Sequence, residues 1–285
     1  MKNSDQARGS RRRRGMYILP SLFTAGNIAA GYYAITQSLM GSIQEPHHFD
    51  YAALAIGFAI PFDALDGRIA RMTNTTSDFG KELDSLADVI TFGVAPSILA
   101  YSWGFRMLPM TMDPWLRERL IQLGGFVCFL FLICGASRLA RFNISTDPVP
   151  KNPGRPGRKY FVGMPIPAAA GMIVSVVHGF GRPIFNWWLA TIWLLLVGLI
   201  GFLMVSTWRF WSGKEINLSR RHPFRWIVLF ALVIWLLVFF SRVILLVLAF
   251  VYMFSGIVAR AAYGRQRRRA SQTDALTSAP TTTPQ

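Results

Sequence analysis

The chain has 285 residues, of which 52% are hydrophobic and only 15% are charged, and its formal net charge is +16. Soluble domains usually carry about 25% charged residues, so this composition excludes a disordered chain, a coiled coil and a small disulfide-built domain. The basic residues lie at the ends of apolar runs, as they do in membrane proteins, and this placement argues against a nucleic-acid-binding protein.

Apolar runs close to membrane-spanning length recur from residue 17 to residue 260. They predict an all-α fold, a polytopic bundle of transmembrane helices. We expect eight spans, over residues 17–40, 50–72, 82–104, 119–141, 162–181, 184–207, 224–240 and 243–260. Only Ser241 and Arg242 divide the last two runs, so six spans followed by a re-entrant pair are the alternative.

The same pattern predicts how the chain is organised. Residues 1–16 form a basic, disordered N-terminal arm, and residues 17–207 form the transmembrane core. A basic cytoplasmic loop over 208–223 leads to additional spans over 224–260. Residues 261–285 are rich in Ser, Thr, Pro, Ala and Gln, which is typical of a disordered tail.

The distribution of basic residues predicts the orientation of the bundle. If both termini are cytoplasmic, 25 of the 30 Lys and Arg residues fall in cytoplasmic segments and five fall in outer loops. Cytoplasmic segments of membrane proteins carry such an excess of positive charge. Two cytoplasmic termini require an even number of spans, as eight or six would give.

Acidic residues are concentrated at one place, because six of the 14 fall between positions 63 and 88. Asp63 and Asp66 are three residues apart at the end of the second predicted span, and Asp84 and Asp88 are four apart at the start of the third. Each pair therefore shares one helix face, and a hairpin brings both pairs to the cytoplasmic side. We expect four carboxylates around one cavity, and ionisable groups at that depth indicate function.

Four carboxylates that lie together need compensating positive charge. Two divalent cations would supply it, and ligands that are all oxygen favour Mg²⁺ or Mn²⁺ over zinc. Two such ions in a carboxylate cage suit the transfer of a phosphoryl group. The alternative from another class is a proton or cation pathway in a cation-coupled transporter.

The full pattern is Asp63, Asp66, Gly67, Ala70, Arg71, Gly80, Asp84 and Asp88 at fixed spacing. It resembles the signature of the CDP-alcohol phosphatidyltransferase family. The resemblance implies that Asp63, Asp66 and Asp84 are chiefly metal ligands. Asp88 would be both a ligand and the general base for the acceptor hydroxyl. That hydroxyl would attack the phosphorus of CDP-diacylglycerol directly and release CMP, without a covalent enzyme intermediate.

The small and basic residues of the motif fit binding of CDP-diacylglycerol. Gly67 and Ala70 leave room for a nucleotide diphosphate near the backbone, and Gly80 opens space beside the stripe of Asp84 and Asp88. Arg71 can reach a phosphate. The resemblance adds Asp66 and Asn27 as donor-binding residues. The structural alternatives are ordinary helix packing for the glycines and a topology-determining charge for the arginine.

Further stretches, over residues 83–96, 137–143 and 161–171 and within the first span, resemble the phosphatidylserine synthase branch of the family. They imply transfer of the phosphatidyl group to the hydroxyl of L-serine, giving phosphatidylserine and CMP. Arg138 and Arg141 share one helix face and could hold the serine carboxylate, with Asn143 beside them.

A topology-determining charge is the alternative for these arginines, and a helix cap is the alternative for Asn143. Glycerol 3-phosphate or an inositol phosphate would also attract arginines. Sister enzymes that use glycerol 3-phosphate, an inositol compound or choline therefore stay open.

The resemblance also implies the setting of the protein. Its substrates would be CDP-diacylglycerol and L-serine, its surroundings membrane lipids, and its assembly a homodimer. We expect an integral protein of the inner membrane of a prokaryotic cell, with the active site facing the cytoplasm and no nucleic-acid partner.

Overall fold

The computed structural model describes residues 22–73, 78–144, 160–211, 241–257 and 260. Outside the described residues lie the predicted arm (1–16), the loop 208–223 from residue 212 onward, the predicted span 224–240 and the tail 261–285.

The chain folds into helices joined by short loops, with one pair of very short strands. In order they are a helix over residues 22–40, α2 (His47–Thr73), α3 (Asp78–Asp88), the π-helical segment η1 (Val89–Val94), α4 (Ala95–Tyr101), the π-helical segment η2 (Ser102–Arg106), α5 (Pro114–Ile144), β1 (Tyr160–Val162), α6 (Ile166–Phe180), α7 (Trp187–Val205), β2 (Arg209–Trp211) and a last helix over Ser241–Ile257.

The predicted class, a polytopic helical membrane protein, is confirmed by the length and composition of the helices. Among the described residues, Phe79–Arg106, Pro114–Ile144 and Trp187–Val205 are long and apolar enough to cross a membrane. Ile166–Phe180 and Ser241–Ile257 are shorter apolar helices. The number of spans and the side on which the termini lie stay predictions.

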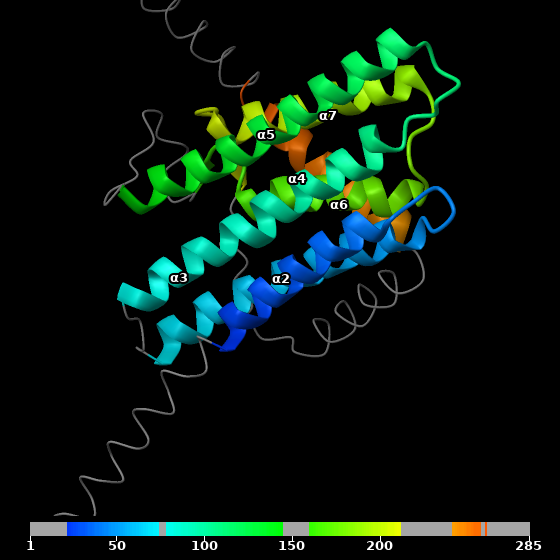
Figure 1. Ribbon diagram of the computed structural model, residues 1–285. Helices are drawn as coiled ribbons and strands as arrows, with labels where there is room; N and C mark the ends of the chain where they lie inside the picture. Colours follow the sequence, from blue (N-terminus) through cyan, green and yellow to red (C-terminus); the bar gives the residue numbers. More distant parts are fainter. Residues whose placement is uncertain (1–21, 74–77, 145–159, 212–240, 258–259, 261–285) are drawn as a thin grey trace, which may run out of the picture.

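The helices are stacked in layers, as Figure 1 shows. α5 packs along α7, and α2 packs along α6. α4 lies between these pairs and contacts α2, α5 and α6. A continuous core of buried residues such as Phe92, Phe131 and Ile173 fills the space between the layers.

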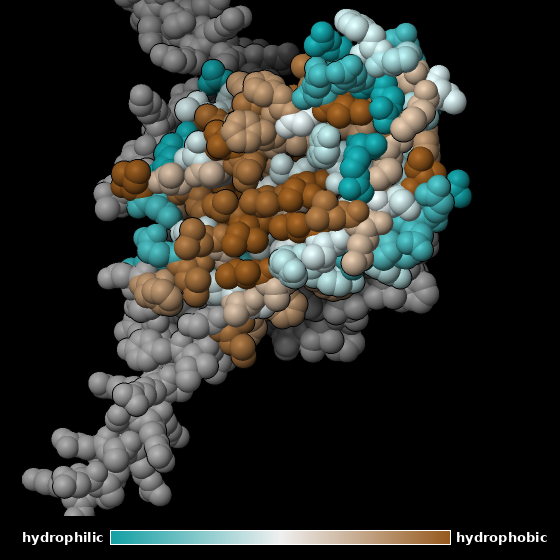
Figure 2. All heavy atoms as spheres, in the orientation of Figure 1, coloured by the Kyte–Doolittle hydropathy of each residue, from teal (hydrophilic) through white to brown (hydrophobic). Residues whose placement is uncertain are grey.

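The outer surface of the bundle is apolar, as expected for a protein that faces lipid. Large side chains such as Phe58, Trp115 and Leu195 are more than 60% exposed. Figure 2 shows brown hydrophobic residues gathered over the middle of one face, while teal residues concentrate toward the end where loops connect the helices. Large exposed apolar patches mark a surface that is covered by lipid or by another protein.

A close contact fixes the first described helix against η1. The hydroxyl of Thr91 donates a hydrogen bond to the carbonyl oxygen of Asn27 at 2.8 Å. Gly31 makes this approach feasible, since a Cβ there would lie 3.0 Å from the Cα of Thr91. η1 begins directly after Asp88, so this contact ties the helix over 22–40 to the end of α3.

The fifth predicted span, 162–181, begins later than expected. β1 and β2 form an antiparallel ladder in which Phe161 pairs with Phe210, and α6 starts only at Ile166. Gly163 has a φ of 76°, which favours glycine and ends the extended segment before the helix. Its N–H donates to the carbonyl oxygen of Trp208 at 2.8 Å. This ladder is a small addition to the predicted all-α fold.

We predict that Gly31→Ala destabilises the folded protein by about 1 to 3 kcal/mol, because the new methyl group would lie 2.7 Å from the hydroxyl oxygen and 3.0 Å from the Cα of Thr91. Gly26→Ala is the matched control on the same helix, since a Cβ at Gly26 meets nothing within 4 Å. Thermal unfolding in detergent, followed by tryptophan fluorescence, measures both. Equal midpoints for Gly31→Ala and the control would contradict the packing described above.

Candidate functional site

Three carboxylates meet between α2 and α3. Asp63 of α2 and Asp84 and Asp88 of α3 each offer an oxygen, and these oxygens all lie within 4.8 Å of one another. All three residues are half-buried. Asp66 belongs to the helical part of α2, but its side chain lies outside the described residues. The structure thus brings together three of the four carboxylates that the sequence pairs predict.

The local sequence explains how the cluster forms. Pro61 lies inside α2, two residues before Asp63, and a proline removes one backbone hydrogen bond of the helix. Asp84 and Asp88 are one helical turn apart and face the same side. α3 ends at Asp88, where the wider π-helical segment η1 begins. Such π-helical segments are frequent at functional sites.

The donor set suits a hard divalent cation. Opposite oxygen ligands of one Mg²⁺ lie about 4.2 Å apart, since each Mg–O bond is about 2.1 Å. The three carboxylate oxygens lie no more than 4.8 Å apart, which is close to that distance. Oδ1 of Asp84 is buried and accepts no hydrogen bond from any residue that the structure describes. The cluster therefore fits one cation after a small closure, or two cations that share the carboxylates.

A groove lies between the helix over 22–40 and α2. Its volume is about 430 Å³, and its lining is almost entirely apolar, with Phe23, Phe58 and Phe62 among the residues. Phe62 directly precedes Asp63. Asn27 also lines the groove; it is only 1% exposed, and neither its amide nitrogen nor its side-chain oxygen bonds to a described residue. A buried amide without partners is costly, so this position suits a polar group of a ligand.

Four further motif residues surround the cluster in the chain. Gly67, Ala70 and Arg71 belong to the last turns of α2, and their side chains lie outside the described residues. Gly80 lies on α3, one turn before Asp84, so it shares the face of the two carboxylates. Their predicted contacts with a nucleotide stay predictions.

The end of α5 places Arg138 near the cluster. Nε of Arg138 is buried and makes no hydrogen bond with a described residue. The guanidinium lies within electrostatic range of Asp88 and of Arg141. A half-buried guanidinium within electrostatic range of Asp88 can serve as the binding group for an anionic substrate.

The other two predicted acceptor residues contact neighbouring helices. Nη1 of Arg141 donates to the carbonyl oxygen of Val205 at 3.2 Å. Nδ2 of Asn143 donates to the hydroxyl of Ser85 at 2.9 Å. Both side chains are exposed at the end of α5. Arg138 thus lies within electrostatic range of Asp88, whereas Arg141 links α5 to α7 and Asn143 links α5 to α3.

Sequence reasoning did not identify Ser85, Thr91 or Tyr252. Ser85 sits next to Asp84 and receives the hydrogen bond of Asn143. Tyr252, on the last helix, lies within electrostatic range of Arg138. No local spacing marks these residues, although a tyrosine inside an apolar run is a weak signal in the sequence.

The sequence model of the CDP-alcohol phosphatidyltransferase family matches residues 17–189. A CDP-diacylglycerol–serine O-phosphatidyltransferase of Helicobacter pylori (strain ATCC 700392 / 26695) is 39% identical over 203 residues, which cover 71% of this chain and 75% of the relative.

Two further relatives extend the comparison. The protein of the same name from Bacillus subtilis (strain 168) is 36% identical over 74% of this chain and 99% of its own length. An archaetidylserine synthase of Methanothermobacter thermautotrophicus is 38% identical over 55% of this chain and 56% of its own length.

We predict that Asp63→Asn, Asp84→Asn and Asp88→Asn each weaken Mn²⁺ binding at least tenfold, because each removes a charged oxygen ligand from the cluster. Glu82→Gln is the matched control, since Glu82 is exposed on α3 and lies outside the cluster. Titration of the purified protein with Mn²⁺, followed by electron paramagnetic resonance, measures the affinity without requiring catalysis. Unchanged Mn²⁺ affinity in all three variants would refute a cation site at these residues.

Proposed function

Because the chain belongs to the CDP-alcohol phosphatidyltransferase family, we propose that it transfers the phosphatidyl group of CDP-diacylglycerol to the hydroxyl of L-serine, giving phosphatidylserine and CMP. The family predicted from the acidic motif is thereby confirmed. The structural observation that carries the proposal is the meeting of Asp63, Asp84 and Asp88, whose oxygens all lie within 4.8 Å of one another.

In this proposal Asp63, Asp66, Asp84 and Asp88 hold two divalent cations, Mg²⁺ or Mn²⁺. When bound, such ions neutralise phosphate oxygens and stabilise the charge of the attacking and leaving groups. The carboxylates themselves supply the oxygen ligands that these hard cations prefer. The support for this role is the close approach of three of these side chains and the chemistry of their oxygens.

The acceptor binds between Asp88 and Arg138, with Arg141 and Asn143 at the rim of the site. Arg138 holds the serine carboxylate and orients the hydroxyl toward Asp88. The hydroxyl oxygen forms a bond to the phosphorus that carries diacylglycerol, and its proton passes to Asp88 as general base. The bond from this phosphorus to the CMP oxygen breaks, and CMP leaves.

The donor binds along the groove between the helix over 22–40 and α2. The apolar lining receives an acyl chain, and the unpartnered amide of Asn27 bonds a polar group near the glycerol backbone. Gly67, Ala70 and Gly80 leave room for the diphosphate, and Arg71 contacts a phosphate. Phe62 adjoins Asp63, so a headgroup anchored in this groove reaches the carboxylates.

The cellular setting follows from the same premises. The chain is a membrane protein, and we propose that it lies in the inner membrane of a prokaryote as a homodimer. Eight spans with both termini in the cytoplasm place the carboxylates at the cytoplasmic side, where serine and CMP exchange with water. The excess of Lys and Arg in the segments assigned to that side supports this orientation.

We predict that the purified protein releases CMP from CDP-diacylglycerol when serine and Mn²⁺ or Mg²⁺ are present. Asp88→Asn lowers the rate at least a hundredfold, because it removes both a ligand and the base, and a chelator abolishes release. Glu82→Gln retains the wild-type rate. The measurement is CMP formation in detergent or lipid nanodiscs, with each acceptor supplied singly.

Each outcome of the acceptor panel has a defined meaning. Release that depends on glycerol 3-phosphate, an inositol compound or choline in place of serine would keep the mechanism and refute the substrate. No release with any acceptor, from folded protein in lipid, would refute the transferase and make cation transport through the carboxylates the function to test.

We further predict that Arg138 and Asn27 separate the two substrates. Arg138→Gln raises the KM for serine by roughly tenfold or more, because it removes a charge-assisted hydrogen bond, and leaves the KM for CDP-diacylglycerol nearly unchanged. Asn27→Leu raises the KM for CDP-diacylglycerol and leaves the KM for serine nearly unchanged. Steady-state kinetics with one substrate varied at a time measures both, and a common effect of both variants on both KM values would contradict the assignment.

A further inference from the structure

A second polar cluster lies far from the carboxylates, where three helices meet. Nδ1 of His178, on α6, is 2.5 Å from Oδ1 of Asp50, on α2. Nε2 of the same ring is 2.9 Å from the hydroxyl oxygen of Ser241, at the start of the last helix. On α2, Asp50 precedes Asp63 by thirteen residues, which corresponds to about 20 Å along a helix. The cluster therefore sits near the other end of the bundle.

The hydrogen bonds of this cluster fix the helices relative to one another. His178 is only 5% exposed, and both of its ring nitrogens have partners. A buried imidazole that is bonded on both sides is held in one orientation, and losing a partner would leave a buried polar atom unsatisfied. The cluster thus joins α2, α6 and the last helix at one point.

The last helix is otherwise held by close apolar contacts. Near its start, Leu246 approaches Gly179 of α6, since a Cβ at Gly179 would lie 3.7 Å from the Leu246 side chain. Near its end, Gly256 lies directly against the buried ring of Phe210 in β2. Tyr252 contacts the same ring, with 5.8 Å between the ring centroids.

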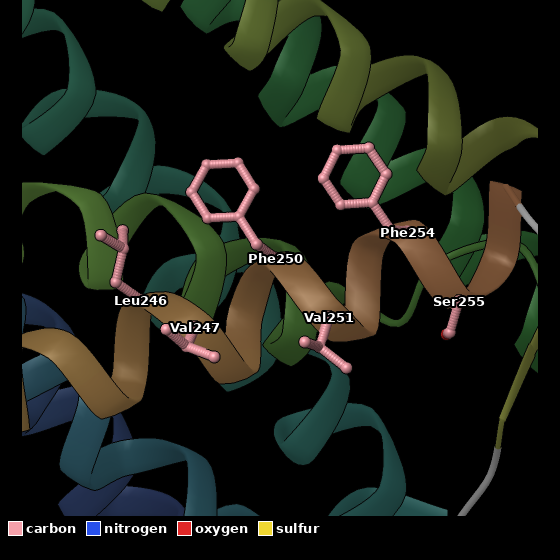
Figure 3. A pocket seen from close by; sticks show the side chains of 6 residues that line it. All are labelled: Leu246, Val247, Phe250, Val251, Phe254 and Ser255. Carbon is pink, nitrogen blue, oxygen red and sulfur yellow. The ribbon is translucent and has the colours of Figure 1, made fainter.

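Ser241 and Tyr252 lie on the same face of the last helix. They are eleven residues apart, which is about three turns, so their side chains point in nearly the same direction. The other face carries a groove of about 530 Å³ that is lined by apolar side chains and Ser255. Figure 3 shows Phe250 and Phe254 projecting together from this outer part of the helix.

The position of Ser241 therefore sets the position of Tyr252. A rotation or shift of the last helix that broke the bond to His178 would also move the tyrosine. Tyr252 lies within electrostatic range of Arg138, which in turn lies within range of Asp88. This helix begins 52 residues after the segment that matches the family model, which ends at residue 189.

We propose that Asp50, His178 and Ser241 are positioning residues for the acceptor site, because their hydrogen bonds fix the start of the last helix, which carries Tyr252 on the same face as Ser241. The last helix then forms a wall of the pocket that receives the acceptor. Tyr252 supplies a polar group to that wall and acts as a specificity-determining residue for the small polar substrate. This inference rests on the proposed function, since it assigns the acceptor to Arg138.

The first test is steady-state kinetics of the full-length protein in nanodiscs. Tyr252→Phe raises the KM for serine by roughly threefold to tenfold, the effect of one hydrogen bond, and leaves the KM for CDP-diacylglycerol unchanged. Ser241→Ala and His178→Asn raise the KM for serine in the same direction, and Ser241→Thr, which keeps the hydroxyl, restores it. The matched controls are Ser255→Ala on the same helix and the exposed Tyr32→Phe, which both keep wild-type constants.

The second test measures the position of the helix without any substrate. Cysteines at Gly179 and Leu246, in a background with Cys128→Ala and Cys134→Ala, form a disulfide on mild oxidation, because a Cβ at position 179 would lie 3.7 Å from the end of the Leu246 side chain. Ser241→Ala slows this reaction at least threefold, and Ser255→Ala does not. The rate of disulfide formation does not depend on the acceptor. It therefore shows whether the helix has moved even if serine is not the substrate.

Several results would overturn the proposal. Unchanged serine KM values in Tyr252→Phe and Ser241→Ala would do so, and so would an equal rise in the KM of both substrates. The hydrogen-bonded chain of Asp50, His178 and Ser241 is also the arrangement that activates a serine nucleophile in some enzymes. Labelling of the wild type by a fluorophosphonate probe that Ser241→Ala abolishes would make Ser241 a nucleophile instead. No serine-dependent CMP release in the wild type would refute the proposed function, and the acceptor-site role with it.

Discussion

The close approach of three carboxyl groups, those of Asp63, Asp84 and Asp88, is the constraint on which the rest of the structure depends. Carboxylate oxygens within 4.8 Å of one another repel by about 3 kcal/mol per ionised pair at an effective dielectric constant of 20. A loose pair of helices would relieve this repulsion by moving apart. The surrounding bundle must therefore hold α2 and α3 together against this repulsion. Binding of the proposed cations would compensate the charge and recover the free energy of folding that the repulsion costs.

The packing around the cluster meets this requirement from several sides. Thr91, three residues after Asp88, is bonded to the backbone of Asn27, and α2 is packed along α6. Asn143 donates a hydrogen bond to Ser85, which lies between Asp84 and Asp88 in the sequence of α3. Each contact joins segments that are distant in the chain, so the cluster is preorganised by tertiary structure rather than by the α2–α3 hairpin alone.

The sequence predicts the features that repeat locally, and misses those that depend on distant partners. Asp84 and Asp88 share a helix face because of their spacing, and the apolar runs predict the helices, so both could be expected. The bond between Asn143 and Ser85 spans 58 residues, and that between His178 and Asp50 spans 128. Helical spacing in the sequence predicts neighbours within one helix, and it does not predict pairs of residues from different helices. The ladder before α6 was missed because Tyr160–Val162 is as apolar as the helix that follows.

The proposed binding of the donor in the groove between the helix over 22–40 and α2 has a consequence for how substrate and product enter and leave the protein. Pulling an acyl chain into water costs about 0.8 kcal/mol for each CH₂ group, so a diacyl substrate does not leave the bilayer at any step. It arrives and departs by diffusion in the plane of the membrane. A product with the same two chains must use the same opening. Turnover is therefore subject to crowding by every other two-chain lipid of the leaflet, and its rate reflects the composition of the membrane as well as the supply of soluble reactants.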